Sequence, residues 1–347
     1  MKCTIKNIAQ ELNLSRNTVS KALKGSSEVS QKTTALILKK AQEMGYKGIS
    51  LPADNKKTDV PSDQSNGSIL FLTKTYASDS EFWTNVLKGI DSILSAAHYH
   101  LMISIMSDSN LKQLKFPSTL SDPSIKGIII VEICDEIVCE ALLKYGLPIV
   151  TVDMPKNYSA ALEKIDIITM ENKKNIYRIV EHLIDKGAKR FSFIGDIYSP
   201  NVGRGFQERY DALCECLETH HLSLDQKCCL LSETPEDFRN SQFIVQKIQD
   251  MAALPDVFIC GNDWTAIQMI YALQFLGYKI PRDVSVVGFD NIPASERIMP
   301  SLTTISTPQK YLGIAAARQM LERIQFPDSP HTYMQYETKL ILRDSTK

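Results

Sequence analysis

Polar side chains gather between positions 16 and 21, and they are the residues of this chain best suited to binding chemistry. Arg16, Asn17, Thr18, Ser20 and Lys21 supply guanidinium, amide, hydroxyl and ammonium groups within two turns of a helix. Such groups can bond to base edges and phosphates in a groove of double-stranded DNA. They would equally suit the water-facing side of an ordinary amphipathic helix pair, so the surrounding elements must separate the two interpretations.

Two short helices with a tight turn between them are predicted around this polar run. Apolar residues recur at helical spacing from Ile5 to Leu12 and again from Val19 to Leu23. Asn13 lies between the two stretches, and Asn tolerates the left-handed conformation that a sharp turn needs. Ser15 can cap the second helix. The pattern predicts a helix-turn-helix.

A third helix and an uneven distribution of charge favour the DNA-binding interpretation. Ser30 can cap a helix that Gly45 ends, and three short helices can close one small core. Residues 1–50 hold nine Lys and Arg against three Glu, a net charge of +6. The whole chain carries −1, so the remainder carries −7. A basic head on an acidic body is typical of a nucleic-acid-binding module joined to another domain.

The segment TIKNIAQELNLSRNTVSKALKG, followed by VSQKTTALILKKAQEMGY, resembles the headpiece of lactose/galactose-repressor (LacI/GalR) transcription factors nearly position by position. The departures are mild, because apolar positions stay apolar and the turn residue stays permissive. The resemblance implies base-edge contacts for Arg16, Asn17 and Lys21. It implies phosphate contacts for Ser15, Thr18, Ser20, Ser30 and Thr33. For Ser15 and Ser30, helix capping alone is the alternative, although a capped helix N-terminus also attracts phosphate.

A linker is predicted over residues 48–67, GISLPADNKKTDVPSDQSNG, because this stretch is polar, contains two Pro and has no helical period. It follows the headpiece, residues 1–47. Relatives usually carry a hinge helix here, whose Leu wedges into the minor groove. Leu51 is the candidate wedge, but Pro52 disfavours a helical conformation at the residue before it. Whether a hinge helix forms in residues 48–67 and kinks DNA from the minor groove therefore stays open.

The remaining residues, 68–347, alternate between apolar runs and helical stretches, which predicts parallel sheets with helices on both faces. The predicted strands are 69–72, 100–105, 127–131, 148–152, 166–168, 190–194, 228–231, 257–260 and 284–288. The resemblance implies the two-lobed effector-binding core that the family shares with periplasmic sugar-binding proteins. The first lobe would comprise residues 68–165 and 300–325. The second would comprise residues 166–292 and 326–347.

Ligands in open α/β sheets bind beyond the carboxyl ends of the strands, so residues at strand ends are the candidates for effector binding. Together with the family resemblance this gives Phe82, Trp83, Glu171, Arg209, Asn262, Asp263, Phe289 and Asp290. Aromatic faces can stack on sugars or bases, the Arg fork can bind hydroxyls or a carboxylate, and Asp290 is the strongest acceptor candidate.

Each of these candidates also has a structural interpretation. One of Phe82 and Trp83 would be a core residue, and Arg209 would form a surface salt bridge. Asp263 would only cap the helix that follows it. Glu171 and Asn172 occupy the family's usual Asp-Asn site, and Glu171 carries one extra methylene.

Catalytic and cofactor motifs are absent from the sequence. There is no phosphate-binding G-x-x-x-x-G-K-[ST] loop and no G-x-S-x-G elbow, and the six His residues have no metal-ligand spacing. The eight Cys residues form no C-x-x-C pair. No cofactor and no catalysis are expected. The chain has no charged-then-apolar leader and no apolar run near twenty residues, so we expect a soluble, cytoplasmic, reduced protein.

The sequence therefore predicts a DNA-binding transcriptional regulator, a repressor by family analogy, whose operator binding is controlled by a small molecule between two lobes. A sugar is the family default, and purine sensing is the alternative. A homodimer is expected, with two heads on two half-sites. A solute-binding protein or sugar-handling enzyme on the same core, and a DNA-organising protein without an effector, remain open. The effector, the sign of its effect and the operator sequence also remain open.

Overall fold

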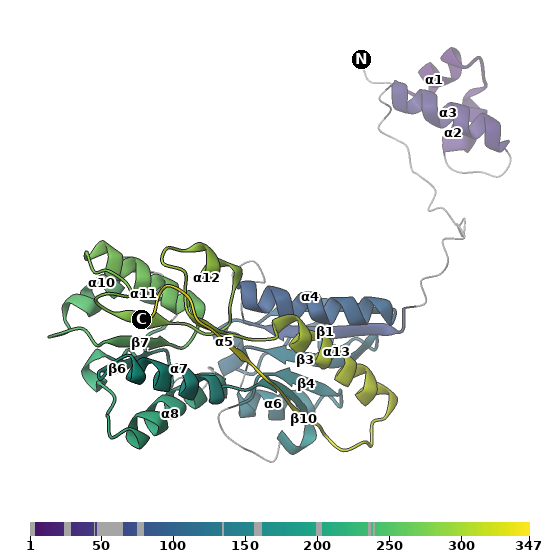
Figure 1. The fold of residues 1–347 in the computed structure, drawn as a ribbon. Coiled ribbons are helices and arrows are strands. Elements are labelled where there is room, and N and C mark those ends of the chain that lie inside the picture. The colour runs from purple at the N-terminus through teal and green to yellow at the C-terminus, as the bar shows by residue number, and fades with distance from the viewer. Residues whose placement is uncertain are drawn as a thin grey trace. The chain divides into compact units, whose positions relative to one another are not determined.

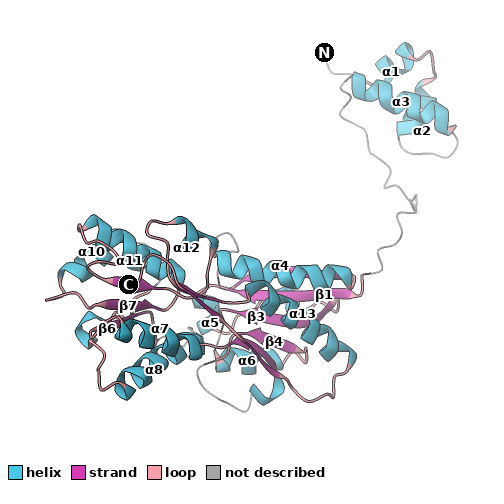
Figure 2. Cartoon of the chain, viewed as in Figure 1, coloured by secondary structure: helices cyan, strands magenta, loops and turns pink. Residues whose placement is uncertain are grey.

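The computed structural model describes residues 4–23, 29–44, 46, 65–74, 80–133, 135–155, 162–198, 203–234, 237–238 and 240–347. The chain divides into two compact units, Met1–Gln64 and Ser65–Lys347, drawn in Figure 1. The predicted linker falls almost wholly outside the described residues, and so do Leu51 and Pro52. Figure 2 shows that the first unit is all helical, whereas the second mixes helices with strands.

The first unit contains the predicted helix-turn-helix. Its helices are α1 (Ile5–Glu11), α2 (Arg16–Leu23) and α3 (Gln31–Glu43). Thr4 caps α1, and Asn13 adopts the expected left-handed conformation, with φ 53°, in the turn before α2. The apolar sides of the three helices bury Ile8, Ala9, Val19, Ala22, Leu23, Ile37 and Ala41. The three predicted helices are confirmed, while Gly45 lies outside the described residues.

The second unit begins with a six-stranded parallel sheet, which we call lobe 1 together with its helices. Its strands are β1 (Gly67–Thr73), β2 (Tyr99–Ile105), β3 (Ile125–Val131), β4 (Ile149–Val152), β5 (Asp166–Met170) and β10 (Tyr333–Tyr336), in the order β10-β5-β4-β3-β1-β2. Strands β1 and β3 are apolar runs because both of their faces are covered. Helices α4 (Glu81–Ala96) and α13 (Gln309–Gln325) pack together on one face, as Figure 1 shows. Helices α5 (Asp108–Lys112) and α6 (Glu136–Leu143) join the core of the other face.

Lobe 2 is built on a three-stranded parallel sheet in the order β6-β7-β8. Its strands are β6 (Phe191–Ile194), β7 (Val257–Cys260) and β8 (Ser285–Val287), extended by the antiparallel pair β9 (Thr304–Ser306) and β11 (Lys339–Ile341). One face packs against α7 (Lys174–Asp185) and α8 (Arg204–Thr219). The other packs against α10 (Ser241–Gln249) and α11 (Asp263–Phe275), and the short α12 (Pro293–Arg297) follows β8.

The structure corrects the predicted lobe boundaries. Residues 166–170 and 333–336 were expected in lobe 2, but β5 pairs with β4 and β10 pairs with β5, so both strands complete the sheet of lobe 1. Residues 302–306 were expected in lobe 1, but Gly288 and Asp290 donate their N–H groups to the carbonyls of Thr303 and Ile305. That pairing attaches β9 to lobe 2. The chain therefore crosses between lobes near residues 171–172, 307–308 and 337–338.

The predicted strand 228–231 is also wrong. Residues Gln226–Cys228 form a 3-10 turn, and only Leu230 forms an isolated bridge, to Ile194 at the edge of β6. The N–H of Cys228 bonds to the carbonyl of Asp225 within the turn, so it is not available to a sheet. The remaining predicted strands are present, with ends that shift by one or two residues.

Candidate functional site

Helix α2 presents the polar residues that the sequence predicted for DNA contacts. Arg16 and Asn17 are exposed, and Thr18, Ser20 and Lys21 are partly exposed. The buried side of the same helix is Val19, Ala22 and Leu23, so the amphipathic pattern turns the polar set outward. Base-edge contact is sterically open to Arg16 and Asn17.

The predicted phosphate-contacting hydroxyls are also helix caps. Ser15 Oγ accepts the N–H of Thr18 at 3.0 Å and lies 2.8 Å from the Thr18 hydroxyl. Ser30 repeats the pattern at α3, where its Oγ accepts the N–H of Thr33 at 3.2 Å and lies 2.7 Å from the Thr33 hydroxyl. Each helix thus begins with two hydroxyls beside free N–H groups of its first turn. This is the arrangement that attracts phosphate oxygens.

In the second unit, Arg209 on α8 is the central charged residue. It is 4% exposed, so the interpretation as a surface salt bridge is wrong. Its Nε donates to Asn172 Oδ1 at 3.0 Å and its Nη1 donates to the carbonyl of Gly261 at 2.5 Å. Its Cζ atom lies 3.5 Å from the ring centroid of Phe289. These contacts come from the ends of β5, β7 and β8, and they fix the guanidinium between the carboxyl ends of the strands.

Acidic side chains surround this guanidinium in excess. Burial lowers the pKa of Arg209, whereas the carboxylates of Asp290, Asp153, Glu208 and Asp263 oppose that change. Burial raises the pKa of Asp153 to about 6, and it raises the pKa of Asp290 well above its ordinary value although Arg209 opposes the shift. Arg204 pairs with Glu208 and Arg343 acts on Asp263, so Asp153 and Asp290 share Arg209, and the site favours a ligand that donates hydrogen bonds.

Asp153 joins the two lobes at this site. Asp153 follows β4 of lobe 1, and its carboxylate lies next to Gly203, which precedes α8 in lobe 2. A Cβ on Gly203 would lie 2.1 Å from Asp153 Oδ2, so any larger residue would have to move the carboxylate. The N–H of Arg204 donates to the carbonyl of Met154 at 2.9 Å. Asp153 and Asp290 both have positive φ, 82° and 121°, and such strain is commonly retained at functional sites.

Asp290 is connected to lobe 1 through its backbone. Gln309 Nε2 donates to the Asp290 carbonyl at 2.7 Å, and Gln309 Oε1 accepts from Asn85 of α4 at 2.8 Å. Phe82 and Trp83 lie one turn earlier on α4, with ring centroids 4.7 Å apart in an edge-to-face arrangement. Phe82 is a core residue and Trp83 is partly exposed. Trp83 is therefore the one of the pair that a ligand could contact.

Two other predicted effector residues, Asn262 and Asp263, have structural partners. Asn262 Oδ1 accepts the N–H of Thr265 at 2.8 Å and caps α11. Asp263 is fully buried, and its two oxygens accept from the N–H of Ile292 and the hydroxyl of Thr304. Burial raises the Asp263 pKa to about 6. Both Asp263 oxygens therefore hold chain segments far along the sequence, which gives this residue a structural role, and its role in effector binding stays a prediction.

Glu171 and Phe289 also differ from expectation. Glu171 Oε1 accepts the N–H groups of Lys173 and Lys174 at 2.7 and 2.8 Å and holds the start of α7. Its Oε2 is buried without a partner among the described residues. Phe289 is fully buried beneath Arg209, so it supports the guanidinium and offers no exposed face for stacking.

Sequence reasoning named Asn172 beside Glu171 but missed Asp153 and Glu208 as members of this cluster. Asp153 follows a strand just as Asp290 does, and the strand-end rule could have found it. Asn172 orients Arg209 and donates through Nδ2 to Glu208 Oε2 at 2.8 Å. Glu208, which precedes Arg209, also pairs with Arg204 at 3.1 Å. The roles of Asn172 and Glu208 depend on three-dimensional neighbours that no local pattern gives.

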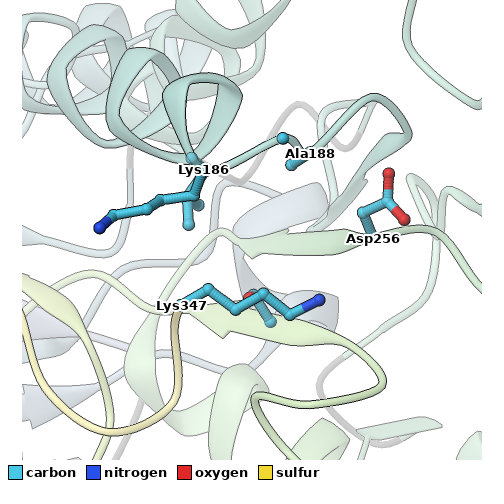
Figure 3. Close-up of a pocket in the computed structure, with 7 residues that line it drawn as sticks. Lys186, Ala188, Asp256 and Lys347 are labelled. Atoms are coloured by element: carbon cyan, nitrogen blue, oxygen red, sulfur yellow. The ribbon is translucent and has the colours of Figure 1, made fainter.

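A small pocket lies at the opposite end of the lobe 2 sheet. It is lined by Leu183, Lys186, Gly187, Ala188, Asp256, Ser285 and Lys347. Figure 3 labels Lys186, Ala188, Asp256 and Lys347 around it. Ala188 and Asp256 precede β6 and β7, so this pocket is at the amino ends of the strands, away from Arg209. In the described part of the chain, no helix is both long and apolar enough to cross a bilayer.

Two family models match the chain in the order that the fold suggests. Residues 4–48 match "Bacterial regulatory proteins, lacI family", and residues 180–346 match "Periplasmic binding protein-like domain". The first match spans the helix-turn-helix unit, and the second covers lobe 2 and the later elements of lobe 1.

Similar proteins align with most or all of this chain. The probable HTH-type transcriptional repressor ExuR of Bacillus subtilis is 25% identical over 349 residues, covering 99% of this chain and 98% of the relative. The transcriptional regulator CelR in complex with cellobiose is 20% identical, with a TM-score of 0.69 and coverage of 99% and 100%. A ribose-bound LacI family regulator from Enterococcus faecium is 24% identical, with a TM-score of 0.66 and coverage of 80% and 98%. The chain thus carries the helix-turn-helix domain of the lacI family of bacterial regulatory proteins, followed by a periplasmic binding protein-like domain.

Proposed function

We propose that this protein is a cytoplasmic transcriptional repressor that releases or binds its operator in response to a small polar effector held around Arg209. The observation that carries the proposal is the combination of a helix-turn-helix unit with a two-lobed core, in which carboxylates from both lobes surround one buried arginine. The protein would act by binding alone, as its regulator relatives indicate, and would need no cofactor.

The proposed effector class is a neutral sugar. A sugar both donates and accepts hydrogen bonds, which matches carboxylate acceptors in Asp153 and Asp290 beside a guanidinium donor in Arg209. Partly exposed Trp83 supplies a face for an apolar sugar surface. A phosphorylated ligand would bring further negative charge to a site that already has excess acid. Two structural neighbours carry cellobiose and ribose, which supports the same class.

For DNA, we propose that Arg16, Asn17 and Lys21 contact base edges and that the hydroxyls of Ser15, Thr18, Ser20, Ser30 and Thr33 contact phosphates. The outward position of the first two residues and the capped starts of α2 and α3 support these roles. Base contacts would set sequence preference, whereas hydroxyl contacts would set orientation.

A homodimer is proposed because the helix-turn-helix works in pairs on half-sites and because lobe 2 has an apolar surface that suits a second copy. Tyr271, Phe275 and Met299 are 51%, 79% and 81% exposed. Gln274 Nε2 donates to the Met299 carbonyl at 2.6 Å, which holds the loop after α12 against α11. We expect Phe275→Glu to dissociate the dimer in sedimentation velocity. Phe326→Glu, at a 54% exposed aromatic of lobe 1, is the control that should leave it intact.

The central test combines operator binding with an effector screen on the full-length protein. Fluorescence anisotropy with promoter DNA at low ionic strength should show binding that weakens steeply with added salt. A thermal-shift screen of neutral sugars, sugar phosphates and nucleobases should raise the melting temperature only with members of the first class, and the same compound should change DNA affinity. Stabilisation by a nucleobase instead would make the protein a purine-responsive regulator. No DNA binding under any condition would contradict the proposal.

A further inference from the structure

Three metal-ligating side chains meet on the outer side of lobe 2, away from the Arg209 cluster. Cys216 and His220 come from the end of α8, and Glu181 comes from α7. The thiol sulfur, an imidazole nitrogen and a carboxylate oxygen all lie within 4.8 Å of one another. Nothing in the helix-turn-helix or in the proposed effector site requires this combination.

Local sequence and helix packing bring the three together. Cys216 and His220 are four residues apart, which puts them on the same side of a helix. Helices α7 and α8 pack against each other through buried residues such as Val180 and Leu217, and this packing carries Glu181 to the same point. Cys216 is buried, whereas Glu181 and His220 are exposed. The group is thus anchored at the thiol and open to solvent on its other side.

The ligand atoms are available for an ion. Among the described residues, the side chains of Glu181 and His220 form no ion pair or hydrogen bond, and Cys216 Sγ has only a 3.9 Å contact with the Tyr177 carbonyl. Ligands of a tetrahedral zinc at bond lengths near 2.0–2.3 Å stand about 3.6 Å apart. Side chains that are already within 4.8 Å reach that spacing by small rotations of the two exposed residues.

We propose that Glu181, Cys216 and His220 bind a divalent transition-metal ion of the zinc class, with water in the fourth position. The donor set of one sulfur, one nitrogen and one oxygen suits this borderline-soft class and excludes magnesium and calcium, which prefer oxygen ligands. The ion would join α7 to α8 two turns beyond Arg209, about 10 Å along the helix axis. It would thereby stabilise the helix pair that positions the proposed effector site.

Cobalt(II) is the probe for the first test, because its spectrum reports thiolate ligation. Titration of the reduced full-length protein should give one equivalent of bound cobalt, a thiolate-to-metal charge-transfer band and the visible bands of a tetrahedral site. Cys216→Ser should abolish the charge-transfer band. His220→Ala, at an exposed position that folding does not depend on, should weaken cobalt binding by at least about tenfold. Zinc should displace the cobalt.

Matched controls lie beside the ligands. Cys214→Ser and His221→Ala change a neighbouring thiol and a neighbouring imidazole that are not part of the group, so both should retain the wild-type spectrum. Zinc should also raise the melting temperature of wild type but not of Glu181→Gln/His220→Ala. The proposal is overturned if wild type gives no charge-transfer band, if the band survives Cys216→Ser, or if it disappears in either control. Loss of sugar sensing with an unchanged cobalt spectrum would contradict the proposed effector site and leave the proposed metal site intact.

Discussion

The two functional regions of this molecule are built in opposite ways. In the helix-turn-helix unit, the groups assigned to DNA are exposed or partly exposed, and the hydroxyls that cap α2 and α3 each contact a residue three positions away, as Ser15 does Thr18. In the core, Arg209 is buried and held by Asn172 and Gly261, which are 37 and 52 residues away in the sequence. Recognition at an exposed surface can therefore change with little cost in stability, whereas the core site and the fold share the same residues.

The largest effect should follow from removing the buried cation. Arg209→Met leaves Asp153 and Asp290 without their opposing charge, and it leaves the buried acceptors Asn172 Oδ1 and the Gly261 carbonyl without a donor, which costs about 1–3 kcal/mol for each acceptor. Urea denaturation should register that loss, and the effector response should disappear. The control Arg282→Met removes a solvent-screened surface pair with Asp283 and should leave stability almost unchanged. If the two variants were equally stable, the contrast between buried and exposed sites would be refuted.

The pH dependence of stability provides the second test. The pKa of Asp153 is raised to about 6 by burial, so the folded state binds its proton more tightly than the unfolded state does. The contribution of Asp153 to the free energy of unfolding is then greatest below about pH 4 and declines as pH rises to about 6. Asp153→Asn should remove that decline and gain about 2–3 kcal/mol at pH 7. Denaturation curves at pH 4.5 and pH 7 measure the free energy of unfolding of both proteins. Parallel pH profiles of variant and wild type would contradict the assignment of this decline to Asp153.

The steric contact between the lobes gives a smaller effect. Gly203→Ala puts a methyl group where the Asp153 carboxylate lies, 2.1 Å from Oδ2, and overpacking of this kind costs about 1–3 kcal/mol. The double variant Gly203→Ala/Asp153→Gly removes the obstructing carboxylate, and Gly tolerates the positive φ at position 153. Thermal unfolding should therefore recover in the double variant. Failure to recover would show that the loss has another cause.

On the DNA-binding side, Lys21→Ala should change sequence preference and leave folding intact. Loss of one base contact reduces discrimination by about 1–3 kcal/mol at the base pair concerned. An operator-library selection measures this, and denaturation should differ from wild type by no more than about 0.5 kcal/mol. Lys6→Ala, at an exposed position on α1, is the control, because it should alter only the salt dependence. Unchanged base preference would remove Lys21 from the contact set.

The same contrast explains what could be predicted from the sequence. The three helices and the left-handed Asn13 depend on residues within one turn of each other, and local periodicity captures them. In the core, the strands were predicted, but β5 was assigned to the wrong lobe. An apolar run predicts a strand without specifying which strand it pairs with, and β5 pairs with β4. Asp263 shares the strand-end position of Asp290. Only the folded chain brings Thr304 and Ile292 to its carboxylate.

The smallest expected effect tests whether a hydroxyl that caps a helix also binds phosphate. Ser15→Ala removes the acceptor for the N–H of Thr18 and should cost about 1 kcal/mol of stability in the headpiece. Ser15→Asp retains the cap but introduces a negative charge at a proposed phosphate contact, so it should keep the stability and lose DNA affinity. Denaturation and anisotropy on both variants separate the two roles. If Ser15→Asp bound DNA as wild type does, the Ser15 hydroxyl would be a cap alone. In the helix-turn-helix unit, only α3, where Ser30 and Thr33 repeat the geometry, would then use the same residues for stability and for recognition, as the core site does.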